Sequence, residues 1–181
     1  MIICKSSVNN EKNIVLVLLI FKTEISLSRQ CQINSIFTKK NMEFDREKVL
    51  QLCNEWCNNT LMETLEIAYI DAGEGFLTAK MPVNSRVHQP MGLLHGGATV
   101  ALAESVGSAA SLMFINPEKQ EVRGIEISAN HLKSKREGTV FCTAKIIHQG
   151  RSIHLWEIRI TDENEKLISL CKLTNMILPR R

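Results

Sequence analysis

A single carboxylate stands in a stretch that otherwise carries no charge. Glu104 is the only Asp, Glu, Lys or Arg between Arg86 and Glu118, and its neighbours in QPMGLLHGGATVALAESVGS are chiefly small or apolar. Burying an unpaired carboxylate is costly, and no basic residue lies nearby in the sequence. A glutamate in this setting can serve as a nucleophile or as a general base. The alternative is a structural ion pair with a basic residue from elsewhere in the chain.

Two adjacent glycines, Gly96 and Gly97, precede that carboxylate. We expect a helix to begin there, and the first N–H groups of a helix have no partner within it and favour negative charge. Because glycine has no side chain, a substrate carbonyl can approach these N–H groups closely. Such an oxyanion hole contributes about 3–4 kcal/mol to catalysis. The alternative is that the glycines only allow the helix to pack tightly on a sheet.

The spacing between these two groups predicts a shared site. Glu104 follows Gly96 by eight residues, which corresponds to about 12 Å along one helix. Both groups of one chain are therefore too far apart to act on the same carbon atom. Two antiparallel helices that meet across a dimer axis could bring the helix start of one subunit to Glu104 of the other. The spacing thus makes a dimer a functional requirement.

Ser108 lies four residues after Glu104 and shares its helix face. Its hydroxyl could hold the carboxylate or an attacking water molecule. A serine within a helix also often bonds back to a carbonyl one turn earlier, and the sequence leaves both readings open.

The elements that position these residues follow from the apolar patterning. Asp45 can cap a first helix whose apolar face ends near Cys57. Strands are expected over 64–70 and 76–83, with a turn at 71–75 between them. The long helix should run from about His95 to Ile115, where Asn116 and Pro117 stop it. Four further strands are expected, at 121–132, 139–148, 152–161 and 166–177.

These elements predict an α+β fold. The long helix is apolar on nearly all sides, so it must be covered on most of them. An antiparallel sheet of about six strands wrapped around it would do this, and Trp156, Ile158 and Ile160 alternate with polar residues as a half-buried strand should.

Several of these segments resemble a known family. Gln89 to Gly97, followed by Leu102–Ser105 and Ser108, is similar to the hotdog-fold acyl-CoA thioesterases. GIEISANHLKSKREG, residues 124–138, is similar to the bacterial branch of that family that includes 1,4-dihydroxy-2-naphthoyl-CoA hydrolase and phenylacetate-type thioesterases. The resemblance covers roughly residues 45–178. It implies a metal-free enzyme without a cofactor that hydrolyses an aromatic acyl-CoA, as in menaquinone biosynthesis. It also implies homodimers with shared active sites that pair into homotetramers.

The resemblance assigns roles to individual residues. Glu104 would be the nucleophile or general base and Gly96 the oxyanion-hole donor, while Gln89 positions the thioester and His95 and Ser108 support the site. The CoA contacts that it implies are Gly124, His131, Leu132, Lys133, Ser134, His148, Gln149, Gly150, Arg151 and Ser152. Lys133, Lys135 and Arg136 would suit the CoA phosphates. The alternative for these three is a solvated turn.

Two other functions remain open at this point. Hotdog folds also include hydratases and dehydratases of acyl thioesters, although those usually have Asp/His or Asn/His pairs where this chain has His-Gly-Gly and a helical Glu104. The third alternative is a protein that binds acyl-CoA without turning it over.

Composition excludes several other classes of protein. A net charge of +3 over 181 residues is too small to indicate a nucleic-acid partner. No phosphate-binding glycine motif is present. Cys53 and Cys57 share a helix face, but no histidine or second cysteine pair accompanies them, so we expect no metal. The cysteine pattern is typical of reduced thiols in a cytoplasmic protein.

The first 41 residues differ from the rest. Their apolar run at 14–21, IVLVLLIF, is too short to cross a bilayer and is followed by no small-x-small cleavage site, although a targeting or anchoring role stays an alternative. Regular patterning begins at Met42. We expect 1–41 to be an extension that is disordered or arises from an upstream start, 42–181 to be the folded domain, and no segment to span a membrane.

Overall fold

The structure is a computed structural model that describes residues 44–180. The expectations for 1–41, including the apolar run at 14–21, lie outside these residues. The helices are α2 (Arg46–Cys57), α3 (Leu61–Thr64), the short 3-10 helix η1 (Ser85–Val87) and α4 (Gly96–Leu112). The strands are β1 (Ala68–Gly73), β2 (Phe76–Val83), β3 (His88–Gln89), β4 (Leu93–Leu94), β5 (Gln120–His131), β6 (Gly138–Gln149), β7 (Ile153–Thr161) and β8 (Leu167–Pro179).

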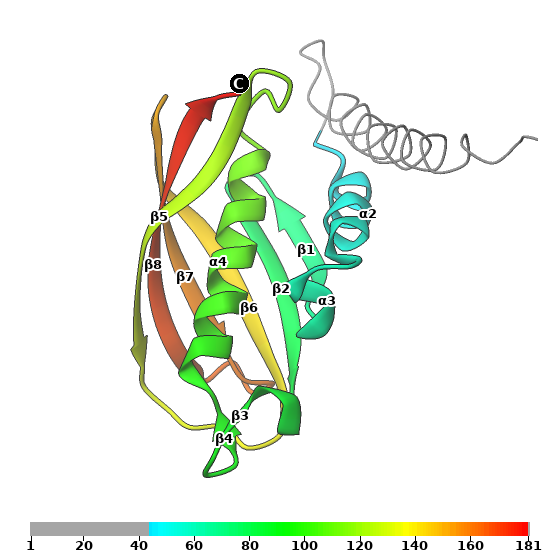
Figure 1. Ribbon diagram of the computed structural model, residues 1–181, viewed down its shortest axis with the longest axis vertical. Coiled ribbons are helices and arrows are strands. Elements are labelled where there is room, and N and C mark those ends of the chain that lie inside the picture. The colour runs from blue at the N-terminus through cyan, green and yellow to red at the C-terminus, as the bar shows by residue number, and fades with distance from the viewer. Residues whose placement is uncertain (1–43, 181) are drawn as a thin grey trace, which may run out of the picture.

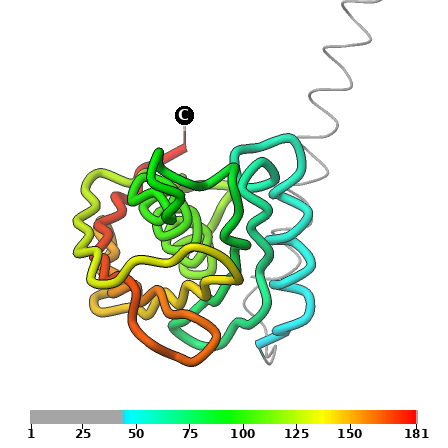
Figure 2. The backbone as a smooth tube through the Cα atoms, turned by 90° about the horizontal axis from the view of Figure 1, so that it is seen from below, coloured from blue at the N-terminus to red at the C-terminus, as the bar shows by residue number. Residues whose placement is uncertain are grey.

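Six of the strands form one antiparallel sheet in the order β1-β2-β6-β7-β8-β5. The sheet curves around α4, which lies against its concave face (Figures 1 and 2). The predicted α+β hotdog architecture is therefore confirmed. Strand β5 is at one end of the sheet and bonds only to β8 among the described residues, so its outer edge is open.

The core lies between the sheet and α4. Trp156, Ile158 and Ile160 of β7 are fully buried, whereas Glu157 and Arg159 between them are exposed. This alternation matches the expected half-buried strand. The apolar composition of the long helix predicts that it is covered on most sides. In the single chain part of α4 is uncovered, since Glu104 is exposed.

The first helix begins and ends close to where the sequence predicts. Asp45 caps α2 by accepting a hydrogen bond from the Lys48 N–H at 3.0 Å. Helix α2 packs against β1 (Figure 1). No helix among residues 44–180 has the length and apolar character needed to cross a membrane.

Two predicted segments differ from the structure. The first part of the expected strand 64–70 is wrong, because Thr60 caps a helical turn at Leu61–Thr64 and Glu66 has a φ of 54°. Strand β1 therefore starts later and continues through most of the expected turn, which is shortened to Glu74 and Gly75. The expected loop before α4 also contains the small β3–β4 hairpin.

Candidate active site

The start of α4 opens on a pocket of about 310 Å³. As the first residue of the helix, Gly96 has an N–H with no carbonyl partner one turn earlier in the helix. The next N–H, of Gly97, donates to Nδ1 of His95 at 2.8 Å. His95 is therefore the N-cap of the helix, and no hydrogen bond of the Gly96 N–H is present among the described residues. Sequence-predicted residues that line this pocket are Gln89, Gly96, His131, Leu132, Lys133 and Ser134.

Gln89 is fixed by the hairpin that precedes α4. Its side-chain Oε1 accepts from the Met91 N–H within the β3–β4 turn. Since the carbonyl oxygen is engaged in the turn, the amide NH₂ is the group that Gln89 can offer to the pocket. An NH₂ beside the Gly96 N–H is suited to a carbonyl oxygen, because both groups are donors.

The ring of His131 occupies the space that a side chain at residue 96 would need. A Cβ at that position would lie 2.7 Å from Nε2 of His131, which is too close for two such atoms. The other ring nitrogen, Nδ1, lies 2.8 Å from Oγ of Ser169, a serine that is only 1% exposed. The glycine thus has a packing reason as well as the catalytic one, and His131 lies against the helix start.

The three basic residues of the loop after β5 have different surroundings. Lys135 forms an ion pair of 2.6 Å with Glu163, and its side chain is largely covered. The hydrogen bond from Lys135, together with the Thr139 N–H, lowers the pKa of Glu163 to about 2. Arg136 reaches the Met91 carbonyl at 3.4 Å. Lys135 and Arg136 therefore hold loops together, and Lys133 is the lysine that lines the pocket.

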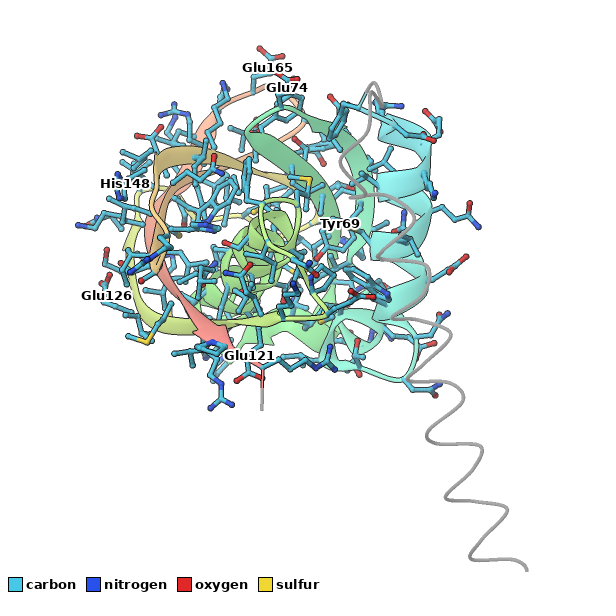
Figure 3. All side chains as sticks on the ribbon, turned by 90° about the horizontal axis from the view of Figure 1, so that it is seen from above. Tyr69, Glu74, Glu121, Glu126, His148 and Glu165 are labelled. Atoms are coloured by element: carbon cyan, nitrogen blue, oxygen red, sulfur yellow. The ribbon has the colours of Figure 1, made fainter. Side chains whose placement is uncertain are left out.

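Glu104 lies at a second pocket, of about 350 Å³, between α4 and α2. The wall is largely apolar and comprises Cys53, Trp56, Met62, Tyr69, Ser105, Ser108, Ala109, Leu112 and Val122 beside Glu104. Tyr69 projects into the interior next to α4, whereas Glu126 and His148 lie on the outside of the molecule (Figure 3). Burial, and to a smaller extent the nearby Cys57, raises the pKa of Cys53 to about 12. This thiol is therefore neutral and does not compete with Glu104 as a nucleophile.

Gly124 of β5 lies directly against the Glu104 carboxylate. A Cβ on Gly124 would be 2.9 Å from Oε1 of Glu104. The missing side chain therefore makes room for the carboxylate. The resemblance implied a contact to CoA for this glycine, and the structure places it at Glu104 in the same chain.

A buried polar network lies beneath Ser108, and sequence reasoning missed it. Asn175 of β8 donates to the Gly107 carbonyl and to Ser111 Oγ, and Trp156 Nε1 also donates to Ser111 Oγ. Ser108 is 3.5 Å from Oδ1 of Asn175, and no bond from it to a helix carbonyl is present among the described residues. Only the β8 register, which pairs Asn175 with Gly124, could have pointed to this residue.

The structure separates the predicted residues into two groups, which we call the helix-start half-site (Gln89, Gly96 and 131–134) and the carboxylate half-site (Glu104, Ser108 and Gly124). Gly96 and Glu104 belong to one uninterrupted helix, so the rise of about 12 Å between them holds. The turn 148–152 is at the same end of the sheet as Gly124, because Ser152 accepts from the Ile177 N–H. It is therefore remote from residues 131–134 in the same chain.

The described residues contain no group of three or more His, Cys, Asp and Glu side chains that could hold a metal ion. A carboxylate, a free helix N–H and an apolar pocket beside them are the parts that an acyl-thioester hydrolase needs. The antiparallel sheet around a central helix is the scaffold of that class of enzyme.

Comparison with known proteins gives the family. Residues 91–169 match the thioesterase superfamily. The 1,4-dihydroxy-2-naphthoyl-CoA hydrolase of Escherichia coli K12 is 42% identical over 76% of this chain and 100% of its own length. The enzyme of that name from Listeria monocytogenes is 43% identical over 67% of this chain and 98% of its own length.

Solved structures agree with this result. A mutant thioesterase from Pseudomonas aeruginosa has a TM-score of 0.71 at 37% identity, over 78% of this chain and 98% of that one. A thioesterase from Haemophilus influenzae has a TM-score of 0.69 at 38% identity, over 78% and 94%. The chain belongs to the thioesterase superfamily and is an enzyme, an acyl-CoA thioester hydrolase with the hotdog fold.

Proposed function

We propose that this enzyme hydrolyses an aromatic acyl-CoA through Glu104, in an active site shared between two subunits. The observation that carries the proposal is the separation of Glu104 and Gly96 along one helix, each beside its own pocket. The helix start of one subunit would polarise the thioester carbonyl, and Glu104 of the other would face the carbonyl carbon.

The proposed chemistry uses the Gly96 N–H, the Gln89 amide, the Glu104 carboxylate and water. The Gly96 N–H and the Gln89 amide would hold the carbonyl oxygen as it gains negative charge. Glu104 would either take a proton from an attacking water or attack the carbon itself to form an anhydride that water then opens. In both routes the C–S bond breaks, CoA leaves as a thiolate that is protonated, and the acyl group leaves as the free acid.

The open edge of β5 supports the dimer. This strand is 12 residues long, and Ile125 on it is 51% exposed. An unpaired edge of this length with an exposed apolar residue favours pairing with another strand, and a second copy of β5 would satisfy it. We extend the proposal to a tetramer through the outer face of the sheet, where Ile147 is 55% exposed.

CoA would then contact both subunits. Lys133 at the helix-start half-site and Arg151 in the turn 148–152 are exposed cations at opposite ends of one sheet. An antiparallel dimer would bring the two ends together, so the phosphates of one CoA could meet residues 131–134 of one subunit and 148–152 of the other. His148, Gln149, Gly150 and Ser152 keep the role that the resemblance implies.

The pocket at Glu104 is the proposed site for the acyl group. A cavity of about 150 Å³ holds a benzene ring, so about 350 Å³ has room for a two-ring group. Trp56 on its wall offers a flat surface for such a ring. The names of the Escherichia coli and Listeria monocytogenes relatives support 1,4-dihydroxy-2-naphthoyl-CoA, and thus menaquinone biosynthesis, as the specific assignment.

We further propose that residues 42–181 form the catalytic domain, that 1–41 is an extension and that the enzyme is cytoplasmic. The four cysteines described, Cys53, Cys57, Cys142 and Cys171, are all buried free thiols, as a reducing compartment favours. Intact mass of the native protein and cell fractionation test these points.

Thiol release from a panel of aromatic and aliphatic acyl-CoAs tests the function, with Glu104→Gln beside the wild type. We expect the variant to fold and dimerise but to lose on the order of a hundredfold or more in kcat, because it keeps the shape and loses the base. Equal rates would refute the role of Glu104. Thermal stabilisation by acyl-CoA without thiol release would favour a binding protein, and hydration of an enoyl-CoA would favour the hydratase alternative.

A further inference from the structure

Asn175 is a polar side chain with no exposed surface, and it lies under the carboxylate half-site. In the β5–β8 ladder it is directly opposite Gly124, the glycine that contacts Glu104. A buried amide needs partners for its two N–H bonds and its oxygen. The partners of this amide decide whether its oxygen or its NH₂ group faces Ser108, and therefore whether the Ser108 hydroxyl donates or accepts there.

The surrounding groups fix which way the amide points. The Gly107 carbonyl can only accept, so the Asn175 atom 3.1 Å from it must be the NH₂ group. The same NH₂ donates its second hydrogen to Ser111 Oγ at 2.8 Å. Ser111 Oγ also accepts from Trp156 Nε1 at 2.8 Å. The oxygen of the Asn175 amide therefore faces Ser108.

This orientation determines the role of the Ser108 hydroxyl. Because the amide oxygen is an acceptor, Ser108 is the donor in this contact, which spans 3.5 Å and is the one hydrogen bond of its hydroxyl among the described residues. The bond is long, as catalytic hydrogen bonds often are before substrate binds. With its proton directed at Asn175, Ser108 presents only lone pairs to the pocket beside Glu104.

We propose that Asn175 is a positioning residue for the hydrolysis described under the proposed function, on which this inference rests. By holding the Ser108 proton, it makes Ser108 an acceptor for the second hydrogen of the attacking water. That water would give one hydrogen bond to Glu104 and one to Ser108, which aims its oxygen at the thioester carbon. Its oxygen forms the C–O bond as Glu104 takes one proton, and the departing thiolate then receives that proton. Glu104 acts here as the general base.

A double-mutant cycle with benzoyl-CoA as the probe tests this role. The variants are Asn175→Leu, Ser108→Ala and the double variant, each measured for kcat and KM. We expect each single change to lower kcat roughly tenfold with KM within about twofold. The double variant should be no slower than Ser108→Ala alone, because Asn175 acts only through Ser108.

A purely structural role for Asn175 gives a different result. The Asn175→Leu change would then slow the Ser108→Ala enzyme by the same factor as the wild type, and the inference would be overturned. A wild-type rate in Asn175→Leu would also overturn it. If the wild type hydrolyses no acyl-CoA of the panel, both the proposed function and this role fail; an active wild type with additive losses removes only the role of Asn175.

Two further variants keep the test decisive. Ser111→Ala removes one of the two acceptors that orient the amide and leaves the Gly107 carbonyl in place. If Asn175→Leu fails to fold, Ser111→Ala should therefore show a smaller loss of kcat that again disappears in the Ser108→Ala background. Thr174→Val is the matched control. Thr174 precedes Asn175 on β8, faces outward and bonds to Glu126, so Thr174→Val should leave kcat unchanged. Melting temperatures report folding for every variant.

Discussion

Gly124 decides where the Glu104 carboxylate can lie. A Cβ at this position would be 2.9 Å from Oε1 of Glu104, and the next nearest atom, Oδ1 of Asn175, would be at an ordinary 3.6 Å. The only close contact is thus with the end of a flexible side chain. A small change at residue 124 should move the carboxylate without disturbing the core.

Gly124→Ala is therefore expected to separate activity from stability. The melting temperature should stay near that of the wild type, while kcat should fall on the order of tenfold to a hundredfold, the effect of displacing a reacting group by about 1 Å. Thiol release and thermal melting measure the two quantities. Ser128→Ala, on the outer face of the same strand, is the control. An unchanged kcat would mean that the position of Glu104 against Gly124 is not needed for the reaction.

At this scale the sequence predicts the residues that stand out by type. Glu104 is conspicuous as a lone charge, and Gly96 as a glycine at a helix start. Asn175, by contrast, is one of two polar residues, with Ser169, at the inward positions of β8, and Ser111 is one of several small helix residues. Their connection depends on the register of β8 against the helix, which no local pattern contains.

Among the elements, the end of α4 and strand β7 meet around a buried histidine. His154 is 2% exposed, its ring packs edge-on against Phe114 at 5.8 Å, and its Nδ1 has no hydrogen-bond partner among the described residues. Burial, and to a smaller extent the nearby His148, lowers the pKa of His154 below its ordinary value of 6.5. The folded protein therefore holds this ring neutral.

This histidine should make the enzyme less stable in acid. As pH falls through about 6.5, the unfolded chain binds a proton at His154 before the folded chain does, so the free energy of unfolding decreases. We expect the melting temperature to drop between pH 7.5 and pH 5.5, and to drop less in His154→Asn. Calorimetric scans of both proteins at the two pH values measure this. Equal drops would assign the acid sensitivity to other groups.

Most of the elements could be predicted because their patterns are long. The four C-terminal strands and the helix that starts at Gly96 repeat their periodicity over many residues, so their boundaries agree within a few residues. The short elements could not be predicted. The turn at Leu61–Thr64 depends on the Thr60 cap, and the two-residue strands of the β3–β4 hairpin are too short to show alternation.

At the scale of the whole molecule, the two half-sites lie in different places on one chain. A shared site makes a prediction that a site within one chain does not. A mixed dimer of Glu104→Gln and Gly96→Val would combine both defects in one site and leave the other site intact. We expect such a dimer to have about half of the wild-type activity, although each variant alone is inactive.

Co-expression with two different affinity tags isolates the mixed dimer, and thiol release measures its activity. The two parent homodimers, purified in the same way, are the controls. An inactive mixed dimer would show that each chain contains its own complete site, and the dimer would then have no role in the chemistry.

Strand β5 holds Gly124 against Glu104 near one end and His131 against Gly96 at the other. A single strand thus contacts both half-sites and fixes the distance between them. If two copies of β5 pair along their open edges, the alignment of that pair sets both active sites at once, because the symmetry of the dimer repeats every displacement. A slip of two residues would shift each site by about 7 Å and disable both together. The pairing of the two β5 strands would then determine how accurately the reacting groups are placed. Residues of β5 that touch no substrate would therefore be as constrained as those that do.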